Sequence, residues 1–131
     1  MRRRFAALLV SFLVLTAQWL VVAPAHAAMD VAKQVLIGAD YSDKDLRGAT
    51  FNLSNLREAT LDSAVMTGTN LSDAVLEGSF AFNTRFKDVV ITGADFTDVP
   101  MRGDQLKSLC AVADGVNSVT GRSTRESLGC A

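Results

Sequence analysis

Two cysteines, fourteen carboxylates and one histidine are the side chains of this sequence that could carry acid–base, nucleophilic or metal chemistry. A nucleophilic serine or cysteine needs a base such as imidazole beside it, and a zinc site needs several His or Cys ligands. The only histidine is His26, the only cysteines are Cys110 and Cys130, and no glycine-rich phosphate loop of either common spacing is present. We therefore expect no catalytic residues, no metal site and no cofactor, and we predict that the protein is not an enzyme.

The N-terminal 27 residues have the composition of a secretory signal, whose removal would also remove His26. A basic start, an apolar middle and a small-x-small end follow one another at residues 2–4, 5–23 and 25–27. We expect cleavage after Ala27, which leaves residues 28–131 as one domain with 14 acidic and 10 basic residues and no membrane segment. The alternative is an uncleaved membrane anchor, because the apolar run is near the lower length that spans a bilayer.

Cys110 and Cys130 are expected to form a disulfide bond. An exported protein meets oxidising conditions, and an even number of cysteines there indicates a structural bridge. Closing a loop of about 21 residues would stabilise the fold by roughly 3 kcal/mol in the chain-entropy model. The alternative is that this bond is a redox switch, which opens to regulate the protein.

The elements that position these residues come from a five-residue repeat over residues 39–103. The third residue of each five is large and apolar in twelve of thirteen cases, and the first is Ala, Ser or Thr in ten. On an extended segment these two residues share one face, whereas second residues such as Asp40, Asp45 and Asp95 point to water. The fifth residues are mostly Gly, Asp and Asn, which favour tight turns. The pattern predicts an all-β solenoid whose centre is filled by alternating small and large side chains.

These fives resemble the pentapeptide-repeat family, whose motif is roughly A(D/N)LXX, as in ADYSD at residues 39–43 and ADFTD at residues 94–98. The resemblance implies a right-handed quadrilateral β-helix with four fives in each coil. The stretch LCAVADGVNSVTGRSTRESLGC at residues 109–130 resembles the tail of lumenal pentapeptide-repeat proteins of cyanobacteria and chloroplasts. That second resemblance implies a location in the thylakoid lumen or in the periplasm of a cyanobacterium.

Short α-helical caps are predicted at both ends of the repeats. Residues 28–38 begin near Asp30, which suits a helix N-cap, and end at Gly38, which suits a helix stop. We expect a helix there that covers the first coil. After the repeats, residues 104–131 are expected to form a disulfide-stapled C-terminal cap with two short helical segments.

The ninth five departs from the pattern, because Ala81 occupies the large third place between Phe80 and Phe82. In strict register both phenylalanines point outward, unless the backbone shifts locally and one ring turns inward. Three further apolar residues also occupy outward second places: Val65, Val75 and Val90. Exposed apolar groups gathered in one patch mark contact surfaces. We hypothesise that Phe80 and Phe82 belong to a partner-binding or self-association face.

The sequence thus predicts an exported, non-enzymatic protein–protein interaction or scaffold module with an unknown protein partner. One alternative is a redox-regulated lumenal protein that is switched through Cys110 and Cys130. A second alternative, known from relatives with this repeat, is a DNA-mimicking protein that binds gyrase. A DNA mimic needs a long acidic face, since duplex DNA carries one charge per roughly 1.7 Å. The predicted outward ladder Asp45, Val65, Arg85 mixes signs, so we expect no nucleic-acid role.

Overall fold

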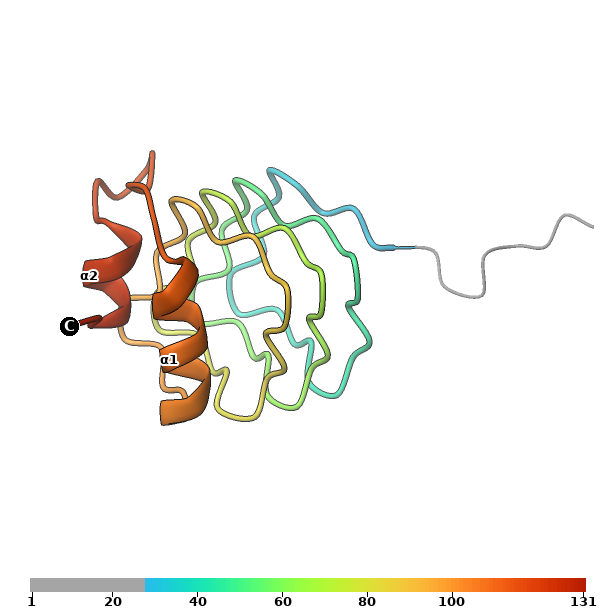
Figure 1. Cartoon of the computed structure of the whole chain (residues 1–131). Helices are drawn as coiled ribbons and strands as arrows, with labels where there is room; N and C mark the ends of the chain where they lie inside the picture. Colours follow the sequence, from blue (N-terminus) through green and yellow to red (C-terminus); the bar gives the residue numbers. More distant parts are fainter. Residues whose placement is uncertain (1–27) are drawn as a thin grey trace, which may run out of the picture.

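The computed structural model describes residues 28–131, so the predicted signal at residues 1–27 lies outside the described part of the chain. The described chain winds into a coil, and helices α1 (Gly103–Val112) and α2 (Thr124–Leu128) lie at its C-terminal end (Figure 1). Ten parallel bridges each join residues twenty positions apart, from Asp30 with Thr50 to Val75 with Asp95. A five-residue repeat in a twenty-residue coil gives four sides per coil, which confirms the predicted quadrilateral β-helix.

Most five-residue sides are held by the same set of backbone hydrogen bonds. The third N–H donates to the following coil, as from Leu46 to the carbonyl of Val65 (2.8 Å). The second N–H donates to the preceding coil, as from Val65 to the carbonyl of Lys44 (2.9 Å). The first N–H closes the corner by donating three residues back, as from Ala49 to the carbonyl of Leu46 (3.0 Å). Backbone groups inside the coil are therefore paired although no side is long enough to form an extended strand.

The corners require an unusual backbone conformation at the fifth residue. Its φ is positive in thirteen of the fifteen fives that end between Lys33 and Gly103, as a type II turn demands at its third position. Gly48 adopts this conformation at φ 69°, and Leu53 adopts it at φ 59° with a side chain that disfavours it. One of the two exceptions is Asn83, which ends the irregular ninth five.

Aspartate and asparagine at the second place have a structural role as well as a solvated one. The Oδ1 atom of Asp40 accepts the backbone N–H of Ser42 (2.9 Å), and that of Asn70 accepts the N–H of Ser72 (3.0 Å). The same contact occurs at Asp95, whose Oδ1 accepts the N–H of Thr97 (3.0 Å). These side chains satisfy the N–H that the ladder leaves unpaired, which explains why the motif prefers Asp or Asn there.

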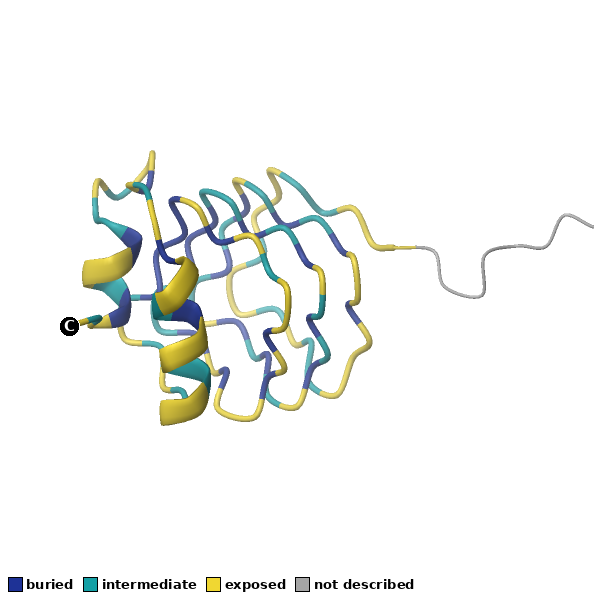
Figure 2. Cartoon of the chain, viewed as in Figure 1, coloured by how far each residue is buried: buried dark blue, intermediate teal, exposed yellow. Residues whose placement is uncertain are grey.

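The buried residues recur in successive coils of the chain (Figure 2), and their side chains form one hydrophobic core cluster. The large third residues from Leu46 to Phe96 are buried, and the small first residues such as Ala59 and Ala64 fill the space between them. Tyr41 and Met101, at the two ends of the predicted repeats, are only partly buried. The predicted alternation of small and large inward side chains is therefore confirmed, and it leaves a packed interior.

The predicted N-terminal cap helix at residues 28–38 is wrong, because these residues form two further sides of the coil. Asp30 is bridged to Thr50 and Val35 to Asn55. The N–H groups of Val31 and Leu36 donate to carbonyls of the next coil, at 3.0 and 2.8 Å. Backbone pairing with a preformed neighbouring coil outweighs the local preference for one short helix, which is marginal alone in water. The repeats therefore begin at Met29, ten residues earlier than the sequence analysis placed them.

The C-terminal residues form a cap that is fastened to the third and fourth coils. Between α1 and α2 lies a segment that we call the strap, residues 113–123, closed by an antiparallel bridge between Val116 and Ser123. Asn117 in the strap is buried, and its Nδ2 donates to the carbonyls of Ala74 (3.2 Å) and Gly93 (2.9 Å). Its Oδ1 accepts two N–H groups of the strap itself, so this one side chain both shapes the strap and binds it to the coil.

Candidate functional site

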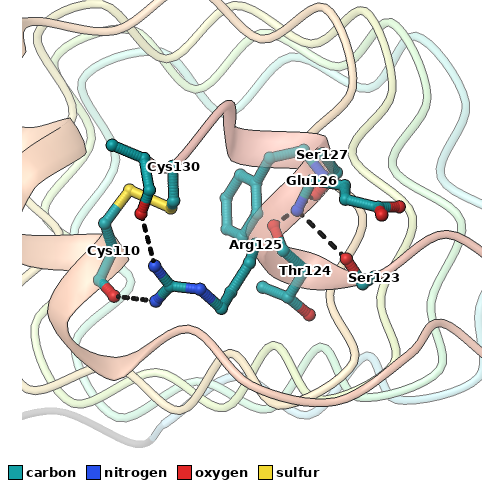
Figure 3. Close-up of a disulfide and its surroundings, with 9 residues drawn as sticks. Cys110, Ser123, Thr124, Arg125, Glu126, Ser127 and Cys130 are labelled. Atoms are coloured by element: carbon teal, nitrogen blue, oxygen red, sulfur yellow. Dashed lines mark hydrogen bonds between the residues drawn. A yellow bond between two sulfur atoms is a disulfide. The ribbon is translucent and has the colours of Figure 1, made fainter.

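The disulfide bond between Cys110 and Cys130 joins α1 to the end of the chain (Figure 3). Beside it, the guanidinium of Arg125 donates to the backbone carbonyls of Cys110 (2.9 Å) and Ala131 (3.0 Å). Both cysteines are partly buried against the core. The bond that the sequence predicts is thus present, and Arg125 supports it by pairing carbonyls on both of the segments that the bond connects.

Helix α2 is placed by its two ends and by one contact with the coil. Ser123 accepts the N–H of Glu126 (3.1 Å) in the N-cap position, and Gly129 ends the helix at φ 72°. The hydroxyl of Ser127 accepts the backbone N–H of Phe96 (2.9 Å), a group on the last complete side of the coil. The short helix therefore supplies the hydrogen-bond acceptor for Phe96 that a further coil would otherwise supply.

Asp95 is the one carboxylate whose side chain is fully buried, at 0% exposed, among the described residues. It accepts the hydroxyl of Thr97 (2.6 Å) and faces the guanidinium of Arg122 in the strap (3.4 Å), which also pairs with Glu77 (3.1 Å). Burial raises the pKa of Asp95, but hydrogen bonds from Thr97 and Thr120 and the charge of Arg122 outweigh it and hold that pKa below its ordinary value. This is a structural ion pair that holds the strap.

Replacing Asp95 by asparagine is expected to lower the free energy of unfolding at pH 7 by about 1–2 kcal/mol, because a charged hydrogen-bond acceptor is lost. A carboxylate with a lowered folded-state pKa adds stability above its unfolded pKa of about 3.9 and loses it as pH falls through the folded pKa. The difference in the free energy of unfolding between wild type and Asp95→Asn should therefore become smaller as the pH falls from 7 towards 3. Urea unfolding across this pH range measures it.

The control is Asp98→Asn, which makes the same chemical change at an exposed turn three residues away. It should shift the free energy of unfolding by less than about 0.5 kcal/mol. A gap for Asp95→Asn that stays constant down to pH 3 would contradict the role assigned to its charge.

Phe80 and Phe82 both lie on the surface, 58% and 52% exposed, while Ala81 between them is buried. The sequence left two possibilities open: both rings point outward, or one ring turns inward. In the structure both rings point outward. The outward valines do not extend this pair into one patch, because they belong to three other sides of the coil. Val75 is moreover 2% exposed, since it lies on the side of the coil that the strap crosses.

One surface feature was missed by the sequence analysis: a hollow of about 690 Å³ between the third coil and the start of α1. We call it the cationic hollow, because three basic side chains line it: Arg85, Lys87 and Arg102. Arg85 and Lys87 come from one side of the coil, and Arg102 precedes α1. No pattern in the sequence predicts that these three side chains lie together. The position of α1 relative to the coil depends on where the chain leaves the repeat.

The described residues offer few other sites for chemistry. Within residues 28–131, no group of three or more His, Cys, Asp or Glu side chains lies close enough to hold a metal ion. In the same range, neither helix has the length and apolar composition that crossing a membrane requires.

Comparison with known proteins finds similarity to pentapeptide-repeat proteins and to proteins of the thylakoid lumen. The family model for pentapeptide repeats, which describes eight copies, matches residues 35–68, 45–78 and 69–103. A segment of 48 residues is 65% identical to the thylakoid lumenal 15 kDa protein 1, chloroplastic, of Arabidopsis thaliana. That segment is 37% of this chain and only 21% of the relative's own length.

Two solved structures are similar to this chain, and the first shows the same arrangement of the backbone. A crystal structure of a pentapeptide repeat protein from the Arabidopsis thaliana thylakoid lumen is 49% identical, with a TM-score of 0.75, over 77% of this chain and 70% of that one. A pentapeptide repeat protein from the cyanobacterium Cyanothece 51142 is 20% identical over 60% of this chain and 50% of that one, with a TM-score of 0.49.

Proposed function

Because the chain belongs to the pentapeptide-repeat family, we propose that it is a non-enzymatic module that binds or scaffolds another protein. One observation carries this proposal: Phe80 and Phe82 expose more than half of their surface from a coil whose interior is filled. Two aromatic rings on a rigid side are a costly arrangement in water and a common one at protein interfaces, where aromatic residues are enriched. The rigid backbone of the coil lowers the entropy lost when a partner binds.

We further propose that the protein works in the thylakoid lumen, or in the periplasm of a cyanobacterium, after export and cleavage behind Ala27. The 49% identity to a protein of the Arabidopsis thylakoid lumen supports the lumen. The composition of residues 2–27 supports export. We also propose that the coil is right-handed, as the family resemblance implies.

A DNA-mimicking role receives little support. The outward residues that stack on one side of the coil are Asp45, Val65 and Arg85, so the charge reverses along the ladder. A gyrase-binding mimic would need a continuous acidic face.

The test is to compare cross-linked partners of the tagged full chain, expressed in its own organism, with those of Phe80→Ser/Phe82→Ser. We expect the variant to lose the partner and keep its thermal stability, because both rings lie outside the core. The matched control is Val35→Ser/Ile37→Ser, which removes two exposed apolar residues from the same places of another five. It should retain the partner.

Two outcomes would overturn the proposal. The first is the absence of any cross-linked partner for the wild-type protein in the exported fraction. The second is an identical set of partners for the wild type and the Phe80→Ser/Phe82→Ser variant.

A further inference from the structure

The cationic hollow lies around one corner of the coil from the two exposed phenylalanines. Asn83 lines the hollow and directly follows Phe82 in the chain. Arg85 and Lys87 lie on the next side, at its second and fourth places, so both project from the same face. A partner that covers Phe82 and passes the corner at Asn83 therefore reaches both cations.

The positive charge in the hollow is largely uncompensated. Among residues 28–131 no carboxylate forms an ion pair with Arg85 or Lys87. In the coil before them, the corresponding places are held by the neutral residues Val65 and Thr67. Arg102, the third cation, is paired with Asp104 at 3.0 Å. Two free cations thus stand together on a domain whose 14 acidic and 10 basic residues make it negative overall.

The shape and charge of the hollow limit what it can bind. It is open and lined largely by polar groups, which does not suit the burial of a drug-sized apolar ligand. A long polyanion such as nucleic acid would be repelled by the negative charge of the rest of the domain and would meet few cations. A short acidic stretch of protein brings two or three carboxylates to the hollow and leaves the rest of the surface uncovered.

We propose that the cationic hollow recognises an acidic segment of a partner protein, with carboxylates on Arg85 and Lys87 and an apolar side chain on Phe82. This inference rests on the proposed interaction function and specifies the chemistry of its partner. Arginine is enriched among the residues that dominate binding energy at protein interfaces, and phenylalanine is enriched at interfaces in general. The unpaired cations also speed association with an acidic surface, in a manner that salt weakens.

The test uses fluorescence anisotropy with a fluorescein-labelled synthetic peptide in which glutamates alternate with phenylalanine and serine. Its counterpart carries glutamine in place of every glutamate, and inorganic phosphate serves as the small-anion probe. We expect the glutamate peptide to bind, and Lys87→Glu and Arg85→Glu to weaken it by about tenfold or more, because like charges then meet. The matched control is Lys33→Glu, an identical change at an exposed place on another side of the first coil. It should change the affinity by less than about twofold, since Lys33 does not line the hollow and salt screens charges that lie apart.

Several results would overturn the inference. These are no binding of the glutamate peptide, equal binding of the glutamine peptide, an equal loss for Lys33→Glu, or binding of phosphate but not of peptide. The cross-linking experiment separates this failure from that of the proposed function. If Arg85→Glu/Lys87→Glu keeps the native partner while Phe80→Ser/Phe82→Ser loses it, the interaction module stands and the acidic segment does not.

Discussion

Replacing Leu71 by alanine is expected to lower the free energy of unfolding by about 2–5 kcal/mol, the cost of a large-to-small change in a core that relaxes little. Leu71 is 0% exposed and occupies the third place of a side that is paired on both edges, through Asn70 to Thr50 and to Val90. The inward side chains of these three neighbouring sides stack on one another. A cavity at Leu71 therefore removes contacts from two interfaces between coils at once. Chemical denaturation followed by circular dichroism measures the loss.

The same substitution at Leu53 is the control, because this leucine is at a corner and is 43% exposed. Its removal should change stability by less than about 0.5–1 kcal/mol, as is usual for surface positions. Equal losses at the two leucines would contradict the assignment of inward and outward places.

Removing the disulfide bond by Cys110→Ala/Cys130→Ala is expected to cost about 3 kcal/mol, through the freedom that the unfolded chain regains. The bond closes the chain across a sequence separation of 20 and holds α1 to the C-terminal residue pair. Thermal unfolding of the wild type with and without a reductant should reproduce the difference, whereas the double variant should be indifferent to the reductant.

Measuring the reduction potential of the bond, and partner binding under reducing conditions, decides between the structural bridge and the redox-regulated alternative. A structural bridge has a reduction potential far below that of its compartment, so it stays closed and partner binding is unchanged under physiological reductants. A potential close to that of the compartment, together with a partner that dissociates on reduction, would instead identify a switch.

Much of the coil follows from the sequence because its rules are local and repeated. A leucine or phenylalanine at the third place and an alanine at the first are sufficient to predict which faces are buried, as at Leu71 and Ala59. The fifth place predicts the corners, as at Gly48, where a positive φ costs nothing. The disulfide bond could be predicted from the expected export together with the number of cysteines, since two leave one pairing.

The remainder depends on neighbours that a local pattern does not contain. The sequence assigns Val31 and Leu36 to a helix, because Asp30 suits a helix N-cap and Gly38 suits a helix stop. Their conformation is decided by carbonyls of the next coil, such as those of Thr50 and Asn55. The burial of Val75 and Asp95 likewise results from the strap, whose course across the coil has no repeating signature.

The cationic hollow could not be predicted for a related reason. Arg85 and Lys87 fit the repeat as ordinary solvated residues, and only the position of α1 turns their side of the coil into a concave surface. Exposed phenylalanines could be proposed from the register, but the small inward Ala81 between them left open whether one ring would turn inward.

The two ends of the described coil differ in how they are capped, and this difference bears on the order in which the coils unfold. Within residues 28–131 no further coil stacks beneath the first coil, and Val31 and Leu36 are only partly buried. The opposite end is locked by Asn117, by the ion pair of Asp95 and by a covalent bond. Since each coil is supported only by its immediate neighbours, we expect unfolding of the described coil to start at the first coil and to proceed towards the locked end. The lifetime of the folded molecule would then be set by the rate at which unfolding proceeds from the first coil.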